Sequence, residues 1–477
     1  MALIALCCPS ASAHVFAQPY TLPVPFAIYG FAATAALLLS FIVAGVFSVV
    51  PASGRTVTSA PTRPAGPAGH VVSFAGRAVS LFLLLFSIVT GFAGNQNAFV
   101  NFNMTFFWII FVLAVPYTVA FTGNFYEAMN PWKTLVLLVE GATGLSFNGR
   151  VRYPPWLGYA PGLILYMAFI WLELFGELLP RGLSAALSIY TLINVWGAYV
   201  FGIDQWFEHG EFFGIFLRLV GKMAPWAPCV DSKVAEHRWS ARLRAPFLGL
   251  LDEPAGHLTL VLFILFMLSS TAFDGLHATL PWVSIYWKSV YPEIARWVHS
   301  APGQQFRTST QIYYVWQWTM LFVSPFFYLF VFAAFMSAVK ALTRSTLSVT
   351  ALVLRFALTL VPIAFVYHVT HYYTVLLAQG SQIAKLISDP FGFGWDLFGT
   401  ARETWQPVML DVGAVWLTQV ALIVGGHIVS VYLAHLEALR IFGTPRRAAL
   451  SQLPMLFLMM FFTNLGLWIL SLPLASG

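Results

Sequence analysis

Ten apolar stretches of about 20 residues recur along this 477-residue sequence. Each is long enough for an α-helix to cross the hydrocarbon core of a bilayer, which is about 30 Å thick. The sequence therefore predicts an all-α, polytopic integral membrane protein with about ten transmembrane helices. The stretches are residues 26–50, 72–92, 104–122, 157–178, 183–203, 257–273, 311–336, 349–378, 412–436 and 450–472.

The composition agrees with this class of protein. Hydrophobic residues make up 59% of the chain and charged residues only 9%, against roughly 25% charged residues in soluble domains. The net charge of +6 is small and scattered, so no nucleic-acid-binding face is expected. Cys7, Cys8 and Cys229 are too widely split for a disulfide framework or a thiolate metal site.

The spans divide the chain into four parts. In order, these are a signal-like or apolar N-terminal tail, spans one to five, a segment on the inner membrane surface, and spans six to ten, at residues 1–25, 26–203, 204–256 and 257–477. Within the third part, FFGIFLRLVGKMAPW (212–226) is apolar on one side and carries Arg218 and Lys222 on the other. This pattern predicts a helix lying in the membrane interface.

The placement of lysine and arginine orients the spans. With both termini outside, most of the 24 Lys and Arg residues fall on the inner side. Such an excess is the positive-inside bias of membrane proteins. We therefore predict a multi-pass protein of the plasma (inner) membrane with its N- and C-termini on the outer, periplasmic side.

The N-terminal tail leaves two interpretations open. The Ala11-Ser12-Ala13 triplet suits signal-peptide cleavage before His14, but the basic region that normally starts a signal peptide is missing. Cleavage would give His14 a free amine beside its imidazole, a pair of ligands that suits copper(II). Without cleavage, the segment remains an apolar tail.

Ionisable residues gather near the outer ends of the spans. Such groups are costly at membrane depth unless they face a cavity, a partner or a ligand. His368 and His371 are three residues apart in the eighth stretch, so they share one helix face. Two histidines with nearby carboxylates could hold a divalent metal, Zn²⁺ or Cu²⁺, and leave one position open for water. Alternatively, the pair only hydrogen-bonds to neighbouring helices.

We therefore predict a metal site at His368 and His371 with catalytic carboxylates around it. Glu173 and Glu177 are spaced i, i+4 and would share a helix face, and Asp274 lies at the outer end of the sixth span. Further candidate residues are His14, Asp389, Asp396 and His427.

A second polar layer lies on the inner side. Asp204, Glu208 and Glu211 are spaced i, i+4, i+7 and predict a solvated acidic stripe if the fifth helix continues through them. His427 follows a Gly-Gly pair, which predicts the close approach of a neighbouring helix and a histidine hydrogen-bonded to it.

No short motif identifies a reaction. The histidine pair is not an HExxH zinc-hydrolase signature, and the sequence has no Walker, GxSxG or haem-attachment motif. Gly392, Gly394 and Gly399 lack phosphate-cradling spacing and a preceding strand, so they predict an outer turn.

Several longer stretches together resemble one family. They are SAHVFAQPYTLPVPFAIYG near the N-terminus, YPPWLG and WLELFGELLPR in the centre, and SSTAFDGLHATLPW (269–282), VPIAFVYHVTHYYTVLLAQG (361–380), SDPFGFGWDLFGTA (388–401) and VGGHIVSVYLAHLEAL (424–439). Over most of its length the chain resembles the bacterial multi-pass membrane family labelled fenitrothion hydrolase. The resemblance implies hydrolysis of an organophosphorus triester at its P–O-aryl bond. Val15 and His277 depart from the family pattern, so His277 is not taken as a family ligand.

The expected function is therefore a membrane-embedded hydrolase of organophosphorus triesters with a metal-activated water in the outer half of the bilayer. An apolar triester dissolves in the bilayer, and the aromatic loop at 275–311 would supply a pocket for its aryl ring. Two alternatives stay open: a transporter that handles protons or metal ions, and a non-catalytic subunit of a membrane metalloenzyme. The expected partners are the lipid bilayer, an apolar small molecule, and a partner subunit or second copy of the chain.

Overall fold

The computed structural model describes residues 26–47, 67–229, 240–297, 305–401, 406–408 and 410–472. These residues form helices and one antiparallel hairpin, β1 (Trp226–Cys229) with β2 (Ser240–Leu243). Among the described residues, ten helical segments are long and apolar enough to cross a membrane, in agreement with the predicted all-helical protein of about ten spans. The predicted tail, with His14, lies outside the described residues.

Most spans are single helices, and three are interrupted. They are α1 (Phe26–Phe47), α2 (Pro67–Ala93), α3 with η1 and α4 (Phe102–Met104, Thr105–Ala114, Val115–Thr122), η2 with α7 (Pro155–Leu157, Ala160–Phe175), α8 (Pro180–Phe201), α11 (Leu258–His277), α14 (Gln305–Thr343), α15 with η5, α16, η6 and α17 (Val349–Phe356, Ala357–Leu360, Val361–Gln379, Gly380–Gln382, Ile383–Ser388), α18 (Val412–Phe442) and α19 (Pro445–Ser471).

Shorter elements connect the spans. They are α5 (Tyr126–Met129), α6 (Pro131–Thr143), α9 (Ile203–His209), α10 (Phe212–Gly221), η3 (Leu248–Leu251), α12 (Leu280–Ile285), η4 (Tyr286–Val290) and α13 (Tyr291–Ala295). Polar side chains start several helices: Asn130, Ser348 and Asp411 each accept a hydrogen bond from a backbone N–H three residues later. Such caps satisfy amide groups that would otherwise lack a partner in the first turn.

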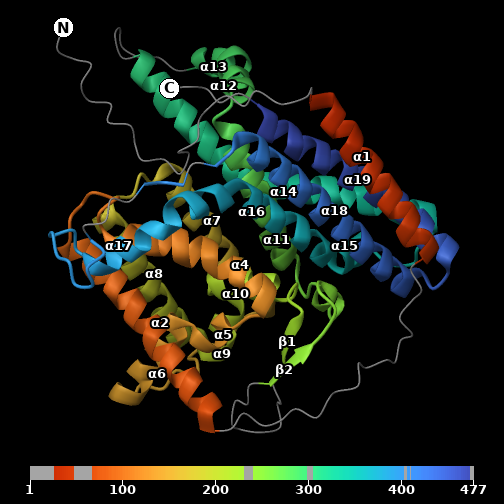
Figure 1. Ribbon diagram of the computed structural model, residues 1–477. Coiled ribbons are helices and arrows are strands. Elements are labelled where there is room, and N and C mark those ends of the chain that lie inside the picture. The colour runs from red at the N-terminus through yellow and green to blue at the C-terminus, as the bar shows by residue number, and fades with distance from the viewer. Residues whose placement is uncertain are drawn as a thin grey trace.

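The helices form two groups that meet at α11 and α16 (Figure 1). In one group, the first span, α1, packs against the last two, α18 and α19, and α14 packs against α11 and α19. In the other group, α2 packs against α8 and α6. Helix α11 contacts both α7 and α16, and α16 also contacts η1. Side chains on α7, α11 and α16 can therefore reach one another in the middle of the bundle.

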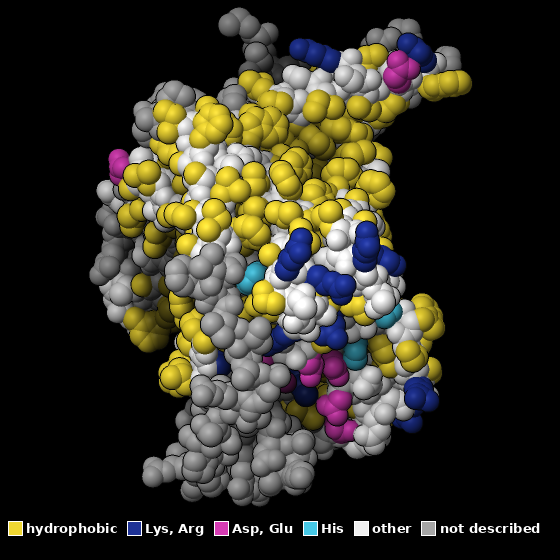
Figure 2. Space-filling model, turned by 90° about the vertical axis from the view of Figure 1, so that its right-hand side faces the viewer, with side chains coloured by type: hydrophobic (Ala, Val, Ile, Leu, Met, Phe, Trp, Pro, Cys, Tyr) yellow, Lys and Arg dark blue, Asp and Glu magenta, His cyan; other side chains and the backbone are white. Residues whose placement is uncertain are grey.

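The outer surface of the bundle is apolar. Large hydrophobic side chains point outward on several spans, for example Phe31 at 76% exposure and Phe121 at 72%. Figure 2 shows hydrophobic side chains covering the upper part of one side, with Lys and Arg gathered below them. An exposed apolar surface flanked by charge is what a lipid-facing bundle requires.

Loops meet at two opposite faces of the bundle. On one face, the loop after α2 bonds to the loop after α17, with Asn95 N–H donating to Phe391 O at 2.8 Å. On the other, the loop before α7 bonds to the end of α8, with Arg150 N–H donating to Val200 O at 2.7 Å. We call these the α17 face and the α9 face.

Helix α10 differs from the prediction. The sequence predicts an interfacial helix, but eight of its ten residues are buried, and it contacts α4, α7 and α16 inside the bundle. The acidic stripe predicted before it does not form either. Gly202, with φ +91°, ends α8, and a break at Gly210 separates α9 from α10. Asp204 is exposed, whereas Glu211 is fully buried.

The Gly-Gly pair of α18 gives a test of helix packing. A Cβ added at Gly426 would lie 2.4 Å from a methyl group of Val366 on α16, whereas one added at Gly425 would meet nothing within 4 Å. The structure thus bears out the predicted close approach at Gly426. We expect Gly426→Ala to destabilise the protein by about 1–3 kcal/mol and Gly425→Ala to change stability by at most about 1 kcal/mol. Thermal unfolding in detergent measures both, and equal effects would contradict this packing.

Candidate functional site

Three helices bring ionisable side chains together toward the α17 face. Asp274 lies in the last turn of α11, His371 and Tyr372 lie in α16, and Glu173 lies near the end of α7. The interior of α11 is buried from Phe263 to Asp274, because other helices surround it. Polar groups on such a helix must bond to one another, since lipid offers no partners.

Asp274 is the centre of this cluster. Its Oδ2 accepts a hydrogen bond from the Tyr372 hydroxyl at 2.7 Å and lies 2.7 Å from His371 Nε2. Its side chain is only 3% exposed. The Tyr372 hydroxyl also faces Glu173, so two carboxylates lie around one phenol. His371 and Tyr372 together hold the Asp274 carboxylate in a fixed orientation.

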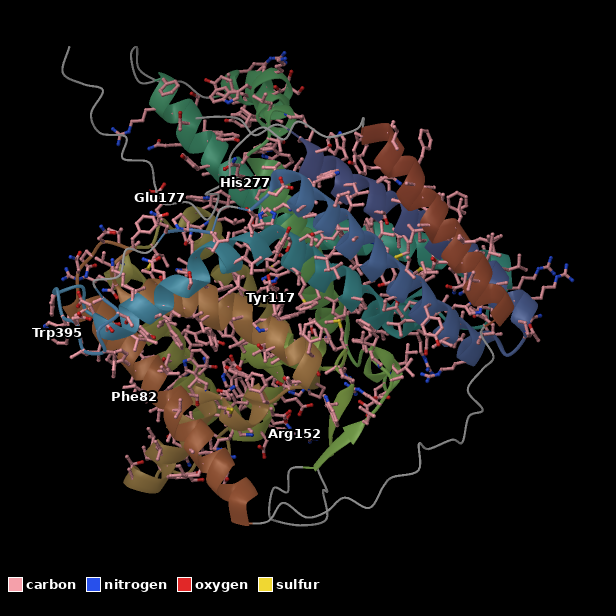
Figure 3. All side chains as sticks on the ribbon, in the orientation of Figure 1. Phe82, Tyr117, Arg152, Glu177, His277 and Trp395 are labelled. Atoms are coloured by element: carbon pink, nitrogen blue, oxygen red, sulfur yellow. The ribbon has the colours of Figure 1, made fainter. Side chains whose placement is uncertain are left out.

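His277 lies at the rim of the cluster. Its Nδ1 is 2.8 Å from the Asp274 carbonyl oxygen and 3.9 Å from the carboxylate Oδ1. Its ring stacks on Phe273 with centroids 5.5 Å apart. Figure 3 labels His277, and Arg152 of the α9 face is labelled far from it in the same view.

A small cavity lies against Asp274. Its volume is about 30 Å³, and a cavity needs roughly 10–15 Å³ to hold a water molecule. One or two waters therefore fit, whereas a drug-sized ligand occupies about 300–1,000 Å³. Its polar lining residues are Tyr166, Glu173, Ser270, Thr271, Asp274, His368 and Tyr372.

The apolar wall of the cavity comes from α10 and η1. Phe212, Phe213 and Phe216 line it from α10, and Phe111 and Val112 line it from η1. The end of η1 has wide π-type turns, because the next backbone N–H bonds to the carbonyl five residues back. Such turns are frequent at functional sites.

The two predicted metal ligands have different surroundings. His368 lines the cavity, and its buried Nδ1 has no hydrogen-bond partner among the described residues. His371 instead bonds to Asp274 and does not line the cavity. A water molecule in the cavity would give His368 Nδ1 a partner, as buried polar atoms require.

The donor set does not fit a metal ion within the described residues. In that part of the chain, no three His, Cys, Asp or Glu side chains converge closely enough to hold one. His371 Nε2 is already engaged by Asp274. The metal site at His368 and His371 stays a prediction, and no step below depends on it.

The predicted carboxylates divide into two groups. Asp274 and Glu173 line the cavity, but Glu177 does not. Helix α7 ends at Phe175, and Glu177 is exposed with a left-handed φ of 41°. Glu173 and Glu177 therefore do not share a helix face, as the i, i+4 spacing predicts. The reason is that the helix stops between them.

The remaining candidate residues have local roles in the described structure. Asp389 accepts hydrogen bonds from the Phe393 and Gly394 N–H groups at 2.9 and 2.7 Å, which fixes the glycine-rich turn. Asp396 accepts one from Ala401 N–H at 3.0 Å in the same loop. Neither residue lines the cavity of Asp274.

His427 is fully buried in α18. Its Nδ1 lies 2.8 Å from the carbonyl oxygen of Ile423, one turn earlier in the same helix. Its ring lies edge-on to Tyr367 of α16, with centroids 6.5 Å apart. This hydrogen bond is within its own helix, whereas the sequence predicts a bond to a neighbouring helix.

Glu211 is a buried carboxylate that the sequence places on a solvated stripe. It is the N-cap of α10, and Phe213 N–H and Gly214 N–H donate to its two oxygens at 3.1 and 2.7 Å. The Tyr190 hydroxyl and the Asn130 amide donate to it at 2.6 and 2.9 Å. Burial raises the pKa of the Glu211 carboxyl above its usual range, while these hydrogen bonds act in the opposite direction.

Glu211 lies directly behind the cavity wall. Phe212 and Phe213, which follow it, both line the cavity. Tyr190, its hydrogen-bond partner, packs on the same two rings with centroids 5.4 and 5.8 Å away but does not line the cavity. A layer of phenylalanine rings therefore separates the Glu211 carboxylate from the space beside Asp274.

The arrangement can support acid–base chemistry on water. It places two carboxylates, an imidazole and two phenols around a space of water size, and the Asp274 side chain there is only 3% exposed. Ionisable residues at membrane depth commonly mark proton relays. Comparison with models of known protein families, with curated proteins and with solved structures found no match.

Proposed function

We propose that this chain transfers protons within the membrane, with Asp274 and Glu173 exchanging protons with water in the cavity. The observation that carries the proposal is the bonding of Asp274 to His371 and Tyr372 beside a space that admits water and little else. Each transfer moves one proton between a cavity water and a carboxylate oxygen. His371 and Tyr372 act as positioning residues, since neither carries the proton in this step.

Glu211 is the second site that accepts a proton in the proposed transfer. It lies one layer of rings from the cavity and, like Asp274, it is a buried carboxylate held by a tyrosine hydroxyl. A proton would pass from the cavity to Glu211 when the side chains of Phe212 and Phe213 admit a bridging water. Phe212 and Phe213 are buried, so the passage of a proton requires these packed rings to move.

The orientation of the protein in the membrane is part of the proposal. The α9 face carries Arg150 and Arg152, and basic loops face the cytoplasm in most membrane proteins. We therefore assign the α9 face to the cytoplasm and the α17 face, with Asp274 beneath it, to the periplasmic side of the plasma membrane. Both termini would then lie outside.

The experiment is proton flux into proteoliposomes loaded with a pH-sensitive dye. A potassium diffusion potential drives the flux, and empty liposomes give the leak. Flux above the leak, carried by the purified full chain, supports proton transfer. Flux equal to the leak, from protein that unfolds cooperatively on heating, would overturn it and favour a non-catalytic subunit role.

Hydrolysis of an organophosphorus triester is the second candidate, favoured by the sequence resemblance and by the Asp274–His371 pair beside a water-sized space. A carboxylate there could take a proton from water while the water oxygen bonds to phosphorus and the nitrophenolate leaves with the electrons of the P–O bond. The cavity would have to widen about tenfold or more to admit such a ligand. Release of nitrophenolate from fenitrothion by the same preparation tests this candidate separately from proton flux.

A further inference from the structure

A second, larger cavity opens at the α9 face. Its volume is about 670 Å³, within the range of ligand-binding pockets. The loop from Asn148 to Gly158 forms one wall, and the end of α8 with Gln205 and His209 of α9 forms the other. None of the residues that line the small cavity at Asp274 takes part in it.

The wall of this cavity is held in a defined conformation. Arg150 and Val151 N–H both donate to Val200 O, at 2.7 and 2.9 Å, so the loop is fixed to the end of α8. Gly149 has φ +88°, and a Cβ there would lie 2.9 Å from the backbone of Phe201. Only glycine fits at position 149 without strain, because this loop touches the end of α8.

The cavity is basic. Arg150, Arg152 and His209 line it together with the neutral polar side chains of Asn148 and Gln205, and none of its described lining residues is acidic. The Arg150 guanidinium lies 4.9 Å from the centroid of the Tyr199 ring, which orients it.

Nearby groups leave this positive charge available. The Tyr153 ring stacks on His209 with centroids 5.0 Å apart. Asp204, the carboxylate next to Gln205 in sequence, lies 3.7 Å from Lys133 Nζ. That lysine partly neutralises Asp204, one of the two acidic residues of α9.

We propose that this cavity binds a phosphate-bearing anion at the membrane surface. Arginine forks bind phosphate oxygens in pairs, and basic pockets at the ends of transmembrane helices bind anionic lipid headgroups. Trp156, in the same loop, is 76% exposed, as expected of an aromatic anchor at headgroup depth. A lipid headgroup and a soluble phosphate ester share this chemistry.

The test uses the purified full chain in nanodiscs. We expect retention of phosphatidylglycerol over phosphatidylcholine in native mass spectrometry, at least about tenfold weaker in Arg150→Gln/Arg152→Gln. Arg446→Gln/Arg447→Gln removes the same charge from two exposed residues that do not line the cavity and serves as the matched control. Arg152→Gln alone, at an exposed position, keeps the test valid if the double variant fails to fold.

Inorganic phosphate separates the two sources of ligand. Displacement of the lipid by millimolar phosphate would support a site that also takes soluble phosphates. Retention despite phosphate would support a headgroup site. Equal retention in the double variant and its matched control, or no preference for the anionic lipid, would overturn the proposal.

Discussion

In proteoliposomes, Asp274→Asn is expected to reduce proton flux by about 10²-fold or more, the size of effect that a positioned acid–base group supplies. Asparagine has nearly the same shape and can still accept the hydrogen bond from Tyr372, which donates to Asp274 at 2.7 Å. It cannot bind and release a proton. The loss would therefore report proton exchange at this side chain rather than a change in packing.

Two further variants test the same prediction, one at the cavity and one as a control. Glu173→Gln removes the other carboxylate that lines the cavity and is expected to reduce the flux as well. Glu293→Gln removes a carboxylate of the exposed ion pair with Arg296 on α13 and is expected to leave the flux unchanged. Wild-type flux in Asp274→Asn would show that the cavity is not on the proton path.

Glu211→Ala is expected to lower the free energy of unfolding by about 3–5 kcal/mol, because each buried donor left unpaired costs about 1–3 kcal/mol. The substitution leaves the Tyr190 hydroxyl and the Asn130 amide without their carboxylate partner. It also removes the cap of α10, which forms one wall of the cavity. Thermal unfolding in detergent measures the loss, and a change below about 1 kcal/mol would contradict the described network.

The same residue gives a pH dependence with a defined sign. Burial raises the folded-state pKa of Glu211 above its unfolded value of about 4.5. The folded state therefore binds this proton more tightly, and the resulting stability is complete below the unfolded pKa and lost as pH rises through the folded pKa. The Glu211→Gln side chain does not titrate. Between the unfolded and the folded pKa, the free energy of unfolding of the wild type should therefore fall with rising pH relative to that of Glu211→Gln. A difference that is constant with pH would contradict the raised pKa.

The sequence predicts the spans well because their signal is local. Twenty consecutive apolar residues can only be buried in lipid or in a large core, and the part of the chain that the structure describes has ten helical segments of this kind. The exception is the segment at 212–226. Its Arg218 and Lys222 indicate an interfacial helix, but Arg218 reaches the carbonyl oxygen of Glu208 at 2.5 Å, and the apolar residues on both sides of α10 are buried.

The site could be predicted only in part. The i, i+3 spacing predicts that His368 and His371 share a helix face, and both lie in α16. It cannot show that His371 bonds to Asp274 whereas His368 lines the cavity. That outcome depends on which helices are neighbours, which a single sequence does not reveal. Gly176 and Pro180 are residues typical of the end of a helix, so the sequence does indicate that α7 ends before Glu177.

Glu211 was missed because its surroundings come from distant segments. Its partners Tyr190 and Asn130 lie 21 and 81 residues away in the chain. One local signal exists, since Glu211 directly precedes the apolar helix Phe212–Gly221 and acidic side chains are favourable at a helix N-terminus. The structure buries this cap together with the helix that follows it.

The most direct test is pH-induced infrared difference spectroscopy on the wild type and Asp274→Asn in liposomes. The method detects the carbonyl stretch of a protonated carboxylic acid, which shifts in heavy water if the group exchanges protons with water. We expect a titrating, exchangeable carboxyl band in the wild type that is missing from Asp274→Asn. Identical bands in the two proteins would show that Asp274 does not exchange protons and would contradict the central claim.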